Sequence, residues 1–292
     1  MRITERKRDM ILIADSGATK TDWMVVSESS SKLIGTEGIN PFHQTEDYIH
    51  NIINSSLLPK MERENICIHN ITEVHFYGAG CLPQPAIKIS NILKEVFPEA
   101  TVKAETDLTG AARALCGNKP GIACILGTGS NSCMYDGERI TANVSPLGYI
   151  LGDEGSGAYL GKRFISDCLK NQLPEYLKTG LLEEYALTTA DILNKVYREP
   201  QANRFLASIT PYIYKVRKDA NVETFLNDCF TEFFKRNIMG YDTTLDISFA
   251  GSIAWFFQEE IKKTAISLDL RTGVFMKEPI WGLKNFHTKI NQ

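Results

Sequence analysis

The sequence predicts an α/β fold of two domains, each a mixed sheet flanked by helices, with a cleft between the domains. Three observations support this prediction. The 292 residues are enough for two domains of ordinary size. A pattern of three strands followed by alternating helices and strands occurs twice along the chain. In both halves, a short turn rich in glycine and hydroxyl side chains joins two strands near the start of the pattern.

The first half of the chain reads as two strands joined by a turn, a third strand, and then alternating helices and strands. Runs of apolar and β-forming residues predict strands at 10–14, 22–26, 33–38, 74–79 and 101–105. Thr45 is expected to cap a helix whose apolar face extends to Leu57. Pro83 and Pro85 are expected to open a second helix, and a third is expected over 107–116.

The second half repeats this order with a longer helical part. Strands are predicted at 122–126, 132–136, 139–143 and 247–250. A mainly helical stretch fills roughly 155–240, and an amphipathic helix is predicted over 253–267. The linker is expected near 117–121, which gives domains of residues 1–117 and 118–292. The last segment is expected either to stay with the second domain or to pack back on the first.

The charge of the chain excludes several kinds of partner. A net charge of −3 provides no basic field, so neither nucleic acid nor an anionic membrane surface is an expected partner. Only the leader 1–10 is basic, and it is expected to be a solvated tail. The apolar run that follows it is too short for a signal peptide or a membrane span.

The seven cysteines include no C-x-x-C pair, and several lie in apolar runs. This distribution predicts reduced, buried thiols in a cytoplasmic enzyme rather than a disulfide framework. The five histidines show no spacing suited to zinc, so a structural metal is not expected.

The first turn of the first half, Asp-Ser-Gly-Ala-Thr-Lys-Thr, has the composition of a phosphate-binding loop. Small residues around Gly17 let backbone N–H groups approach a phosphate closely. Thr19, Lys20 and Thr21 supply further donors. Asp15, at the end of a strand, is suited to hold Mg²⁺ directly or through water. A plain polar hairpin turn is the alternative for this segment taken by itself.

The turn at the equivalent place of the second half repeats this chemistry. Gly127, Thr128, Gly129 and Ser130 combine backbone N–H groups with hydroxyl donors. Two such loops at the same topological point of two half-molecules are suited to clamp one polyphosphate from both sides. The pair is much rarer by chance than either loop alone, and it therefore predicts nucleotide binding.

Three further segments carry candidate functional residues. Asp153 and Glu154 lie inside a glycine run at a predicted helix start, where carboxylates can bind substrate hydroxyls, reach a metal or complement the helix N-terminus. Asp107 sits where a short strand meets a helix, and taken alone it is explained as a helix N-cap. Gly251 and Ser252 break a strand from a helix, a shape against which a base or ribose can lie.

The stretch that ends in Gly161-Lys162-Arg163 approaches a P-loop. Ser156 replaces the first glycine of that motif and Arg163 replaces its hydroxyl residue. No predicted strand precedes the stretch, so the P-loop interpretation is rejected.

These residues together make the chain similar to the BadF/BadG/BcrA/BcrD ATPase family, and within it to the N-acetylglucosamine kinases. The resemblance runs from about Met10 to the end and rests on five spaced motifs in the expected order. It implies two RNase H-like (actin-like ATPase) domains and the use of ATP with Mg²⁺. It further implies that Thr19 and Thr128 contact ATP and that the Gly251-Ser252 turn receives the adenosine.

The same resemblance implies a sugar substrate. Asn40, Asp153 and the backbone of Gly148 would hold the sugar, with Glu154 beside them, and Asp107 would be the catalytic base in contact with the acceptor. The implied reaction is ATP-dependent phosphorylation of the 6-hydroxyl of an N-acetylhexosamine. Among these sugars, N-acetylglucosamine is the first expected acceptor. Relatives often dimerise through the second domain, so the resemblance also implies that a homodimer is possible.

Three alternatives to this function remain open. One is a kinase for another amino sugar or hexose, such as glucosamine, N-acetylmuramate or glucose. A second is an ATPase activator of a 2-hydroxyacyl-CoA dehydratase, which needs a [4Fe–4S] cluster bound by cysteines of two subunits. Cys116 and Cys133 lie near the domain junction, but neither is in a glycine-flanked segment of the expected kind. A sugar-sensing regulator is the third, and the leader is too short for its DNA-binding segment.

Overall fold

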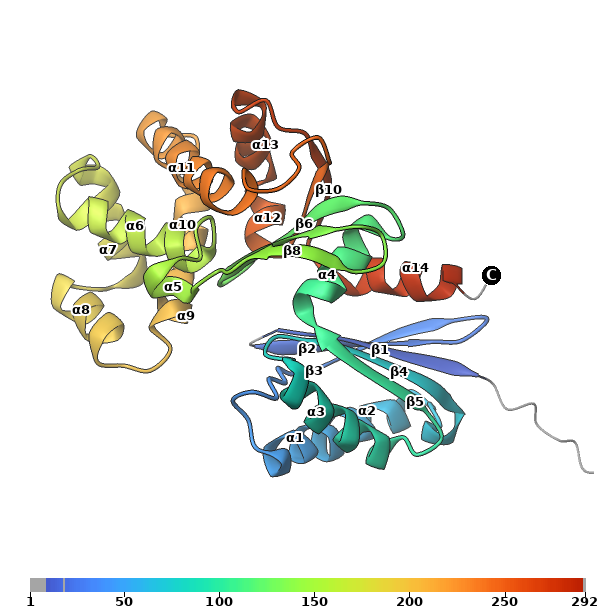
Figure 1. The fold of residues 1–292 in the computed structure, drawn as a ribbon. Helices are drawn as coiled ribbons and strands as arrows, with labels where there is room; N and C mark the ends of the chain where they lie inside the picture. The colour runs from blue at the N-terminus through green and yellow to red at the C-terminus, as the bar shows by residue number, and fades with distance from the viewer. Residues whose placement is uncertain (1–8, 18, 291–292) are drawn as a thin grey trace, which may run out of the picture. The chain divides into compact units, whose positions relative to one another are not determined.

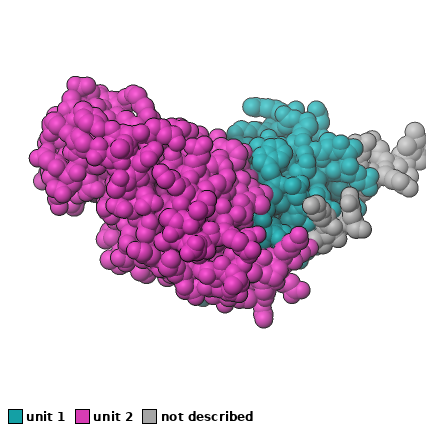
Figure 2. Space-filling model, turned by 90° about the horizontal axis from the view of Figure 1, so that it is seen from above, with its two compact units in different colours: residues 1–117, 279–292 teal, residues 118–278 magenta. Residues whose placement is uncertain are grey.

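The computed structural model describes residues 9–17 and 19–290, without the side chains of residues 289 and 290. The basic leader up to residue 8 and Ala18 of the first predicted phosphate loop lie outside the described residues. The chain divides into two compact units, which are coloured separately in Figure 2. Unit 1 comprises Met1–Gly117 and Pro279–Gln292, and unit 2 comprises Asn118–Glu278.

Unit 1 is built on a mixed five-stranded sheet with the order β3-β2-β1-β4-β5. Its strands are β1 (Met10–Ser16), β2 (Lys20–Val26), β3 (Ser31–Glu37), β4 (Ile71–Gly78) and β5 (Thr101–Thr106). β2 is antiparallel to β1 and β3, whereas β1, β4 and β5 are parallel. Short turns can join only antiparallel neighbours, and the parallel strands are instead linked through helices.

Helices cover both faces of the unit 1 sheet. They are α1 (Glu46–Ile52), α2 (Leu58–Arg63), α3 (Pro83–Val96), α4 (Asp107–Cys116) and α14 (Ile280–Ile290), with a π-helical turn at Ile53–Leu57 and a 3₁₀ turn at Ile68–Asn70. Figure 1 shows α1 to α3 on one face and α4 with α14 on the other. Because side chains alternate along a strand, Leu12 and Val74 enter the core beside α1 to α3. Tyr77 points to the other face, where it contacts His287 of α14.

Unit 2 has a second mixed five-stranded sheet with the order β10-β9-β6-β7-β8. Its strands are β6 (Gly121–Leu126), β7 (Ser130–Tyr135), β8 (Ile140–Val144), β9 (Ile247–Ala250) and β10 (Thr272–Met276). β7 is antiparallel to β6 and β8, whereas β6, β9 and β10 are parallel. Both sheets therefore have the same topology, and the predicted fold of two related α/β halves is confirmed.

The helices of unit 2 pack on an aromatic core. They are α5 (Gly148–Leu151), α6 (Gly157–Leu169), α7 (Glu175–Tyr185), α8 (Thr189–Tyr197), α9 (Ala202–Ala207), α10 (Thr210–Lys215), α11 (Ala220–Phe233), α12 (Ser252–Phe256) and α13 (Gln258–Ser267), with a π-helical turn at Phe234–Ile238. Phe233 and Phe234 of this core contact Phe249 of β9. None of the described helices has the length and apolar character that a bilayer crossing requires.

The structure confirms several local predictions and corrects others. Thr45 caps α1 as predicted, by accepting from Tyr48 N. The helix predicted over 253–267 is two helices, because the buried Phe257 leaves helical geometry between them (φ −101°, ψ 23°). The N-cap of α4 is Thr106 and not Asp107, since the Thr106 side chain accepts from Thr109 N.

Among the elements that were not predicted are β10 and α14. β10 contains Gly273, and its side chains are only partly buried, so it lacks the apolar run of a central strand. α14 contains Gly282, which breaks the usual helical composition. A Cβ at Gly282 would lie 2.5 Å from Ala114 O, so the glycine permits the close packing of α14 on α4.

Candidate functional site

The carboxyl ends of three parallel strands meet at one edge of the unit 1 sheet. The register pairs Ser16 of β1 with Gly78 of β4, and Gly78 with Thr106 of β5. The residues that follow these strands therefore lie side by side. In open α/β sheets this edge is where ligands bind.

The first predicted phosphate loop crosses this edge. Gly17 N donates to Lys20 O at 3.0 Å, and Thr19 and Lys20 are exposed. The Lys20 ammonium lies 2.8 Å from Asp22 Oδ2. Asp15 is half-buried and lies opposite Asp22 in the β1–β2 register, which puts both carboxylates on one face of the sheet.

Thr21 differs from its neighbours because its hydroxyl forms hydrogen bonds within unit 1. The residue is fully buried, and Oγ1 lies 2.6 Å from Ser16 Oγ, 3.0 Å from Glu37 O and 3.1 Å from Ile39 N. These bonds fix the segment that follows β3 against the end of β1. The geometry gives Thr21 a structural task, and its predicted role as a phosphate donor stays a prediction that this geometry does not favour.

Asn40 lies at the same edge as the first phosphate loop. Its neighbour Ile39 is held by Ser16 Oγ, which accepts from Ile39 N at 3.0 Å. Asn40 Oδ1 accepts from Phe42 N at 3.0 Å, and a Cβ at Gly80 would lie 2.3 Å from this oxygen. Within the described part of the chain, no group accepts from Asn40 Nδ2. The side chain is thus oriented through its oxygen, and its amide nitrogen is left for a ligand.

Asp107 is the first residue of α4, directly after β5. Because Thr106 caps the helix, the Asp107 carboxylate is not used as the N-cap, although its Oδ1 accepts from Leu108 N at 2.9 Å. Burial raises the pKa of Asp107, while the Leu108 N–H opposes that shift. Burial and the nearby Asp107 charge together raise the pKa of Cys81 to about 12. A half-buried carboxylate with a raised pKa has the character of a general base.

The second predicted phosphate loop follows β6 in unit 2. Gly127 N donates to Gly129 O at 2.9 Å, and the start of α6 packs on the loop through bonds from Gly157 N to Gly127 O (2.8 Å) and from Ala158 N to Thr128 O (3.0 Å). Ser130 is buried, and its Oγ is among the buried polar atoms of the described residues that have no hydrogen-bond partner. Such an orphaned hydroxyl is rare in a folded protein and fits a group kept for a ligand.

Asp153 and Glu154 lie beside this loop. Asp153 has left-handed backbone geometry (φ 56°), which is strained for a residue other than glycine, and its Oδ1 accepts from Ser130 N at 3.4 Å. Burial and the charge of Glu154 raise the pKa of Asp153 to about 6, against the Ser130 bond. Glu154 Oε2 accepts from Asn237 Nδ2 at 3.3 Å, and Oε1 lies 3.8 Å from Arg236 Nε.

Gly148 begins the short helix α5, with φ 74°. A Cβ at this position would meet no atom within 4 Å, so the backbone here borders open space. The same loop is closed by a bond from Asp153 N to Pro146 O at 2.9 Å. Gly148, Asp153 and Ser130 are thus linked through one set of contacts.

Gly251 joins this cluster from β9. Its φ of 108° is open to glycine only, and a Cβ would lie 2.5 Å from Leu126 O at the end of β6. Ser252 follows as the exposed first residue of α12. The predicted adenosine turn therefore lies directly against the second phosphate loop. Unit 1 contains the predicted site residues Asp15, Gly17, Thr19, Lys20, Thr21, Asn40 and Asp107, and unit 2 contains the others.

A solved structure identifies the family. A candidate N-acetylglucosamine kinase from Porphyromonas gingivalis is 44% identical, with 97% of this chain and 100% of that chain covered and a TM-score of 0.92. The chain belongs to this family, among the BadF/BadG/BcrA/BcrD ATPases. It is an ATP-dependent sugar kinase.

More distant structures share the actin-like ATPase fold with this kinase. A candidate N-acetylglucosamine kinase from Chromobacterium violaceum is 16% identical over 96% of this chain and 99% of that chain, with a TM-score of 0.63. Component A of the (R)-2-hydroxyglutaryl-CoA dehydratase from Acidaminococcus fermentans is 10% identical over 94% of each chain, with a TM-score of 0.51. At these identities the likeness shows the fold alone. No family model and no curated protein matches the sequence.

The kinase would use a Mg²⁺ ion that arrives with ATP, and the residues fit such an ion. Among the described residues, no group of three or more His, Cys, Asp or Glu side chains can hold a metal by itself. Mg²⁺ usually keeps several waters and takes one or two carboxylates together with substrate phosphates. Asp15, with Asp22 opposite it at the end of the β1–β2 hairpin, meets this requirement.

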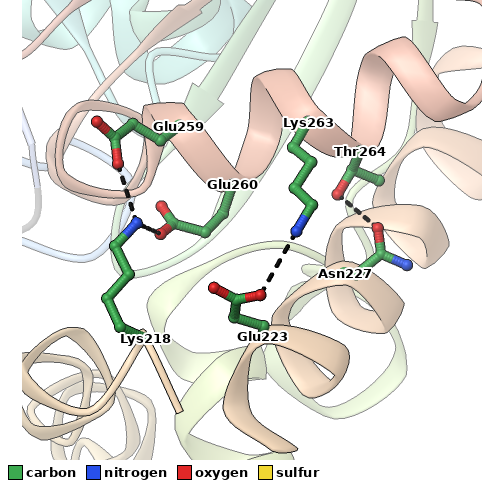
Figure 3. A pocket seen from close by; sticks show the side chains of 7 residues that line it. All are labelled: Lys218, Glu223, Asn227, Glu259, Glu260, Lys263 and Thr264. Atoms are coloured by element: carbon green, nitrogen blue, oxygen red, sulfur yellow. Dashed lines mark hydrogen bonds and ion pairs between the residues drawn. The ribbon is translucent and has the colours of Figure 1, made fainter. Parts of the chain in front are cut away.

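Figure 3 shows a charged pocket of unit 2 that contains none of the predicted site residues. It is lined by Lys218, Glu223, Asn227, Glu259, Glu260, Lys263 and Thr264. Its charges compensate one another, since Lys218 pairs with Glu259 at 3.2 Å and Lys263 with Glu223 at 3.5 Å. The volume of about 100 Å³ is below the roughly 300 Å³ at which small-molecule sites begin. We therefore assign this pocket no part in the kinase reaction.

Three residues of the site were missed by sequence reasoning. Ser16 was counted only among the small residues around Gly17, yet it is a fully buried centre of hydrogen bonds, and the signal was a small polar residue ending an apolar strand. Asp22 was assigned only to a strand, although its spacing puts it opposite Asp15. Lys162 lay in the rejected P-loop-like stretch, and nothing in its local sequence indicated that its ammonium donates to Tyr149 O of α5 at 2.7 Å.

Proposed function

We propose that this kinase transfers the γ-phosphoryl group of ATP to the 6-hydroxyl of an N-acetylhexosamine, and that N-acetylglucosamine is the acceptor. The observation that carries the proposal is the Asp107 carboxyl. It follows β5 at the ligand-binding edge of the sheet, it is not consumed as a helix cap, and burial raises its pKa. The acceptor follows from the 44% identical P. gingivalis protein, which bears the name of an N-acetylglucosamine kinase.

Each of the two phosphate loops would donate to nucleotide phosphates. Gly17, Thr19 and Lys20 offer exposed donors in unit 1, and Gly127 to Ser130 offer backbone N–H groups and hydroxyls in unit 2. The turn at Gly251 and Ser252 would take the adenosine, because it lies against the second loop. Mg²⁺, held by Asp15, would neutralise phosphate charge when bound.

The acceptor would be held by Asn40, Asp153 and Glu154, with the backbone at Gly148. Asn40 Nδ2 can donate to a sugar oxygen, while carboxylates accept from hydroxyl groups. Asp153 and Glu154 are held in place by Ser130 N and Asn237 Nδ2. Positioned side chains of this kind supply orientation, which is a large part of catalysis in phosphoryl transfer.

In the reaction, the Asp107 carboxylate accepts the proton of the sugar hydroxyl. The hydroxyl oxygen forms its bond to the γ-phosphorus as the bond to the β,γ-bridging oxygen breaks, and ADP leaves. A positioned base of this kind increases the reaction rate by roughly 10²–10⁴-fold. The raised pKa of Asp107 makes it a stronger base than an exposed aspartate.

Two secondary proposals concern the state of the enzyme. We propose a cytoplasmic enzyme, since all seven cysteines are free thiols and five of them are buried.

We also propose a homodimer through unit 2, where Ile150, Leu151 and Tyr197 expose large apolar side chains. Light scattering of the purified protein checks the second proposal, and a monomer at micromolar concentration contradicts it.

The dehydratase-activator alternative receives no support from the cysteines. Cys133 is fully buried in β7, and burial raises the pKa of Cys116 to about 11. Neither thiol is suited to ligate a cluster shared with a second subunit, because cluster ligands are thiolates.

An acceptor panel tests the proposed reaction. ADP formation is measured with Mg²⁺-ATP and N-acetylglucosamine, glucosamine, N-acetylmuramate or glucose, beside a control without sugar, and phosphorus NMR locates the phosphate. We expect the highest kcat/KM with N-acetylglucosamine and phosphate on O6. A higher kcat/KM with another acceptor would reassign the substrate. ATP hydrolysis that no sugar stimulates would overturn the proposed function.

A further inference from the structure

The turn that presents Gly148 is held under strain. It enters α5 through Leu147 (φ 59°) and Gly148 (φ 74°) and leaves through Asp153 (φ 56°). Ile150 and Leu151 in the same turn are 70% and 74% exposed in the single chain, so little apolar burial within the chain holds the turn in place. A strained backbone persists only where its surroundings fix it. The contacts that fix α5 therefore determine the shape of this part of the acceptor site.

Lys162 supplies one of these contacts from the body of the unit. It lies within α6, whose N-cap Ser156 accepts from Tyr159 N. The Lys162 ammonium donates to Tyr149 O at 2.7 Å and lies 5.5 Å from the centre of the Tyr159 ring. Tyr149 directly follows Gly148, so this bond ties the presented backbone to α6.

The charge of Lys162 also acts on the acceptor carboxylates. It lowers the pKa of Asp153, in opposition to burial and the charge of Glu154. Burial lowers the pKa of Lys162, while Glu154 and Asp153 raise it in return. The Lys162 ammonium thus acts on both parts of the predicted acceptor site in unit 2. It donates to the backbone and it interacts electrostatically with the carboxylates.

A cavity of about 620 Å³ lies beside α5 and α6. Its lining is mostly apolar, with Ile165, Leu169 and Leu206 among the residues, and it includes Tyr149 and Lys162. A lysine with its stem along apolar surface and its head on a carbonyl is confined on both sides. This confinement makes Lys162 suited to hold a backbone in one position.

We propose that Lys162 is a positioning residue for the acceptor: its bond to Tyr149 O holds the Gly148–Leu151 turn in the conformation that binds the sugar. This inference rests on the proposed function, because it assumes that Gly148 and Asp153 contact the acceptor. Lys162 lies in α6, outside the predicted phosphate loop of unit 2, and we therefore expect it to affect acceptor binding without direct action on the phosphoryl group.

Lys162→Met tests the proposal, because it keeps the apolar stem and removes the donor. A hydrogen bond from a charged donor makes a difference on the order of tenfold or more in binding. We expect the KM for N-acetylglucosamine to rise on that order, with the KM for ATP unchanged and kcat changed less than the acceptor KM. Lys162→Arg retains a charged donor and should restore part of the loss.

Lys170→Met is the matched control. Lys170 lines the same cavity but is exposed and, among the described residues, forms no hydrogen bond to α5, so its removal should leave both KM values unchanged. If Lys162→Met does not fold, Lys162→Leu, which also lacks a donor, replaces it. An unchanged acceptor KM in the Lys162 variant, or an equal rise in the KM for ATP, overturns the proposal.

Hydrogen exchange separates this proposal from the proposed function. The amides of residues 148–153 should exchange faster in Lys162→Met than in wild type, and not in Lys170→Met. If wild type shows no sugar-dependent ATP turnover, the proposed function fails, while exchange still reports whether Lys162 holds the turn. Equal exchange in wild type and Lys162→Met would show that Lys162 does not hold the turn.

Discussion

Ser130 carries a buried hydroxyl that has no partner among the described residues, which makes a sharp test of the second phosphate loop possible. In Ser130→Ala no intramolecular hydrogen bond is lost, so the free energy of unfolding should stay within about 0.5 kcal/mol of wild type. If the hydroxyl donates to a phosphate of ATP, the KM for ATP should rise by roughly tenfold. Denaturant unfolding and steady-state kinetics measure the two effects.

Ser132→Ala, two residues along β7, is the control for this prediction. Ser132 is also buried, but its hydroxyl lies 3.1 Å from Asn237 O and 3.0 Å from Tyr241 OH. Its loss should destabilise the protein by about 1 kcal/mol and leave the KM for ATP unchanged. A destabilised Ser130→Ala with wild-type ATP kinetics would remove Ser130 from the nucleotide site.

Asp153 predicts a pH dependence of acceptor binding. Its pKa is raised to about 6, so the carboxylate is protonated as the pH falls through 6 and loses one acceptor position. The KM for the sugar should therefore rise below pH 6, while the KM for ATP does not follow. Kinetics between pH 5 and 8 measure this, and Asp153→Asn should abolish the inflection. A sugar KM that is flat across this range would contradict the assignment.

Residues could be assigned from sequence where the chemistry is local. The paired carboxylates of Asp153 and Glu154 in a glycine run were found in this way, and both are buried beside the second loop. The contacts of Thr21 and Lys162 could not be predicted, because they depend on partners brought close only by the fold. Oγ1 of Thr21 turns to Ile39 N, and the ammonium of Lys162 reaches Tyr149 O.

At the level of elements, α14 is attached to the body of unit 1 through a buried polar network. Tyr77 OH lies 2.9 Å from His287 Nε2 and accepts from Arg113 Nη1 at 2.8 Å, and Arg113 forms an ion pair with Glu105. The rings of His75 and His287 stack with their centres 3.9 Å apart. α14 thus returns from unit 2 to a fixed place on α4 and β4.

This network predicts a loss of stability in acid. Burial, then the charges of His75, Arg113 and Lys103, lower the pKa of His287 to about 3. Between pH 6.5 and 3 the His287 side chain is protonated in the unfolded chain but not in the folded chain. The free energy of unfolding therefore decreases as the pH falls. The slope is at most about 1.4 kcal/mol per pH unit.

Urea unfolding of wild type and His287→Gln across this pH range measures the effect. Glutamine keeps a hydrogen-bonding group near Tyr77 and does not titrate, so its unfolding midpoint should fall less steeply than that of wild type. The exposed His69 provides the control as His69→Gln. Parallel curves for wild type and His287→Gln would show that His287 is not the proton-linked group.

Elements with a strong local signal were predictable, and those defined by long-range contact were not. Hairpins, the Thr45 cap and the helix opened by Pro83 follow from propensity and capping rules. The break at Phe257 comes from the aromatic core, where its ring meets Tyr214 and Phe230. The register of β10 and the helix around Gly282 likewise depend on neighbours remote in sequence.

On the scale of the whole molecule, the chain builds the same sheet twice and puts a glycine-containing turn after the first parallel strand of each. Short turns end β1 and β6, and the residues that follow the parallel strands carry the candidate site in both units. The repeated order was visible in the sequence because it depends on local strand and helix signals. The return of α14 to unit 1 was left open, since nothing near residue 280 encodes its partner.

The most direct test of the account concerns Asp107. Wild type and Asp107→Asn are compared in sugar-dependent ADP formation, ATP dissociation constant and thermal unfolding. The account predicts a fall of about 10²–10⁴-fold in sugar-dependent turnover, with ATP binding and melting temperature retained. Undiminished turnover in the folded variant would contradict it, because the proton of the acceptor hydroxyl would then leave without Asp107.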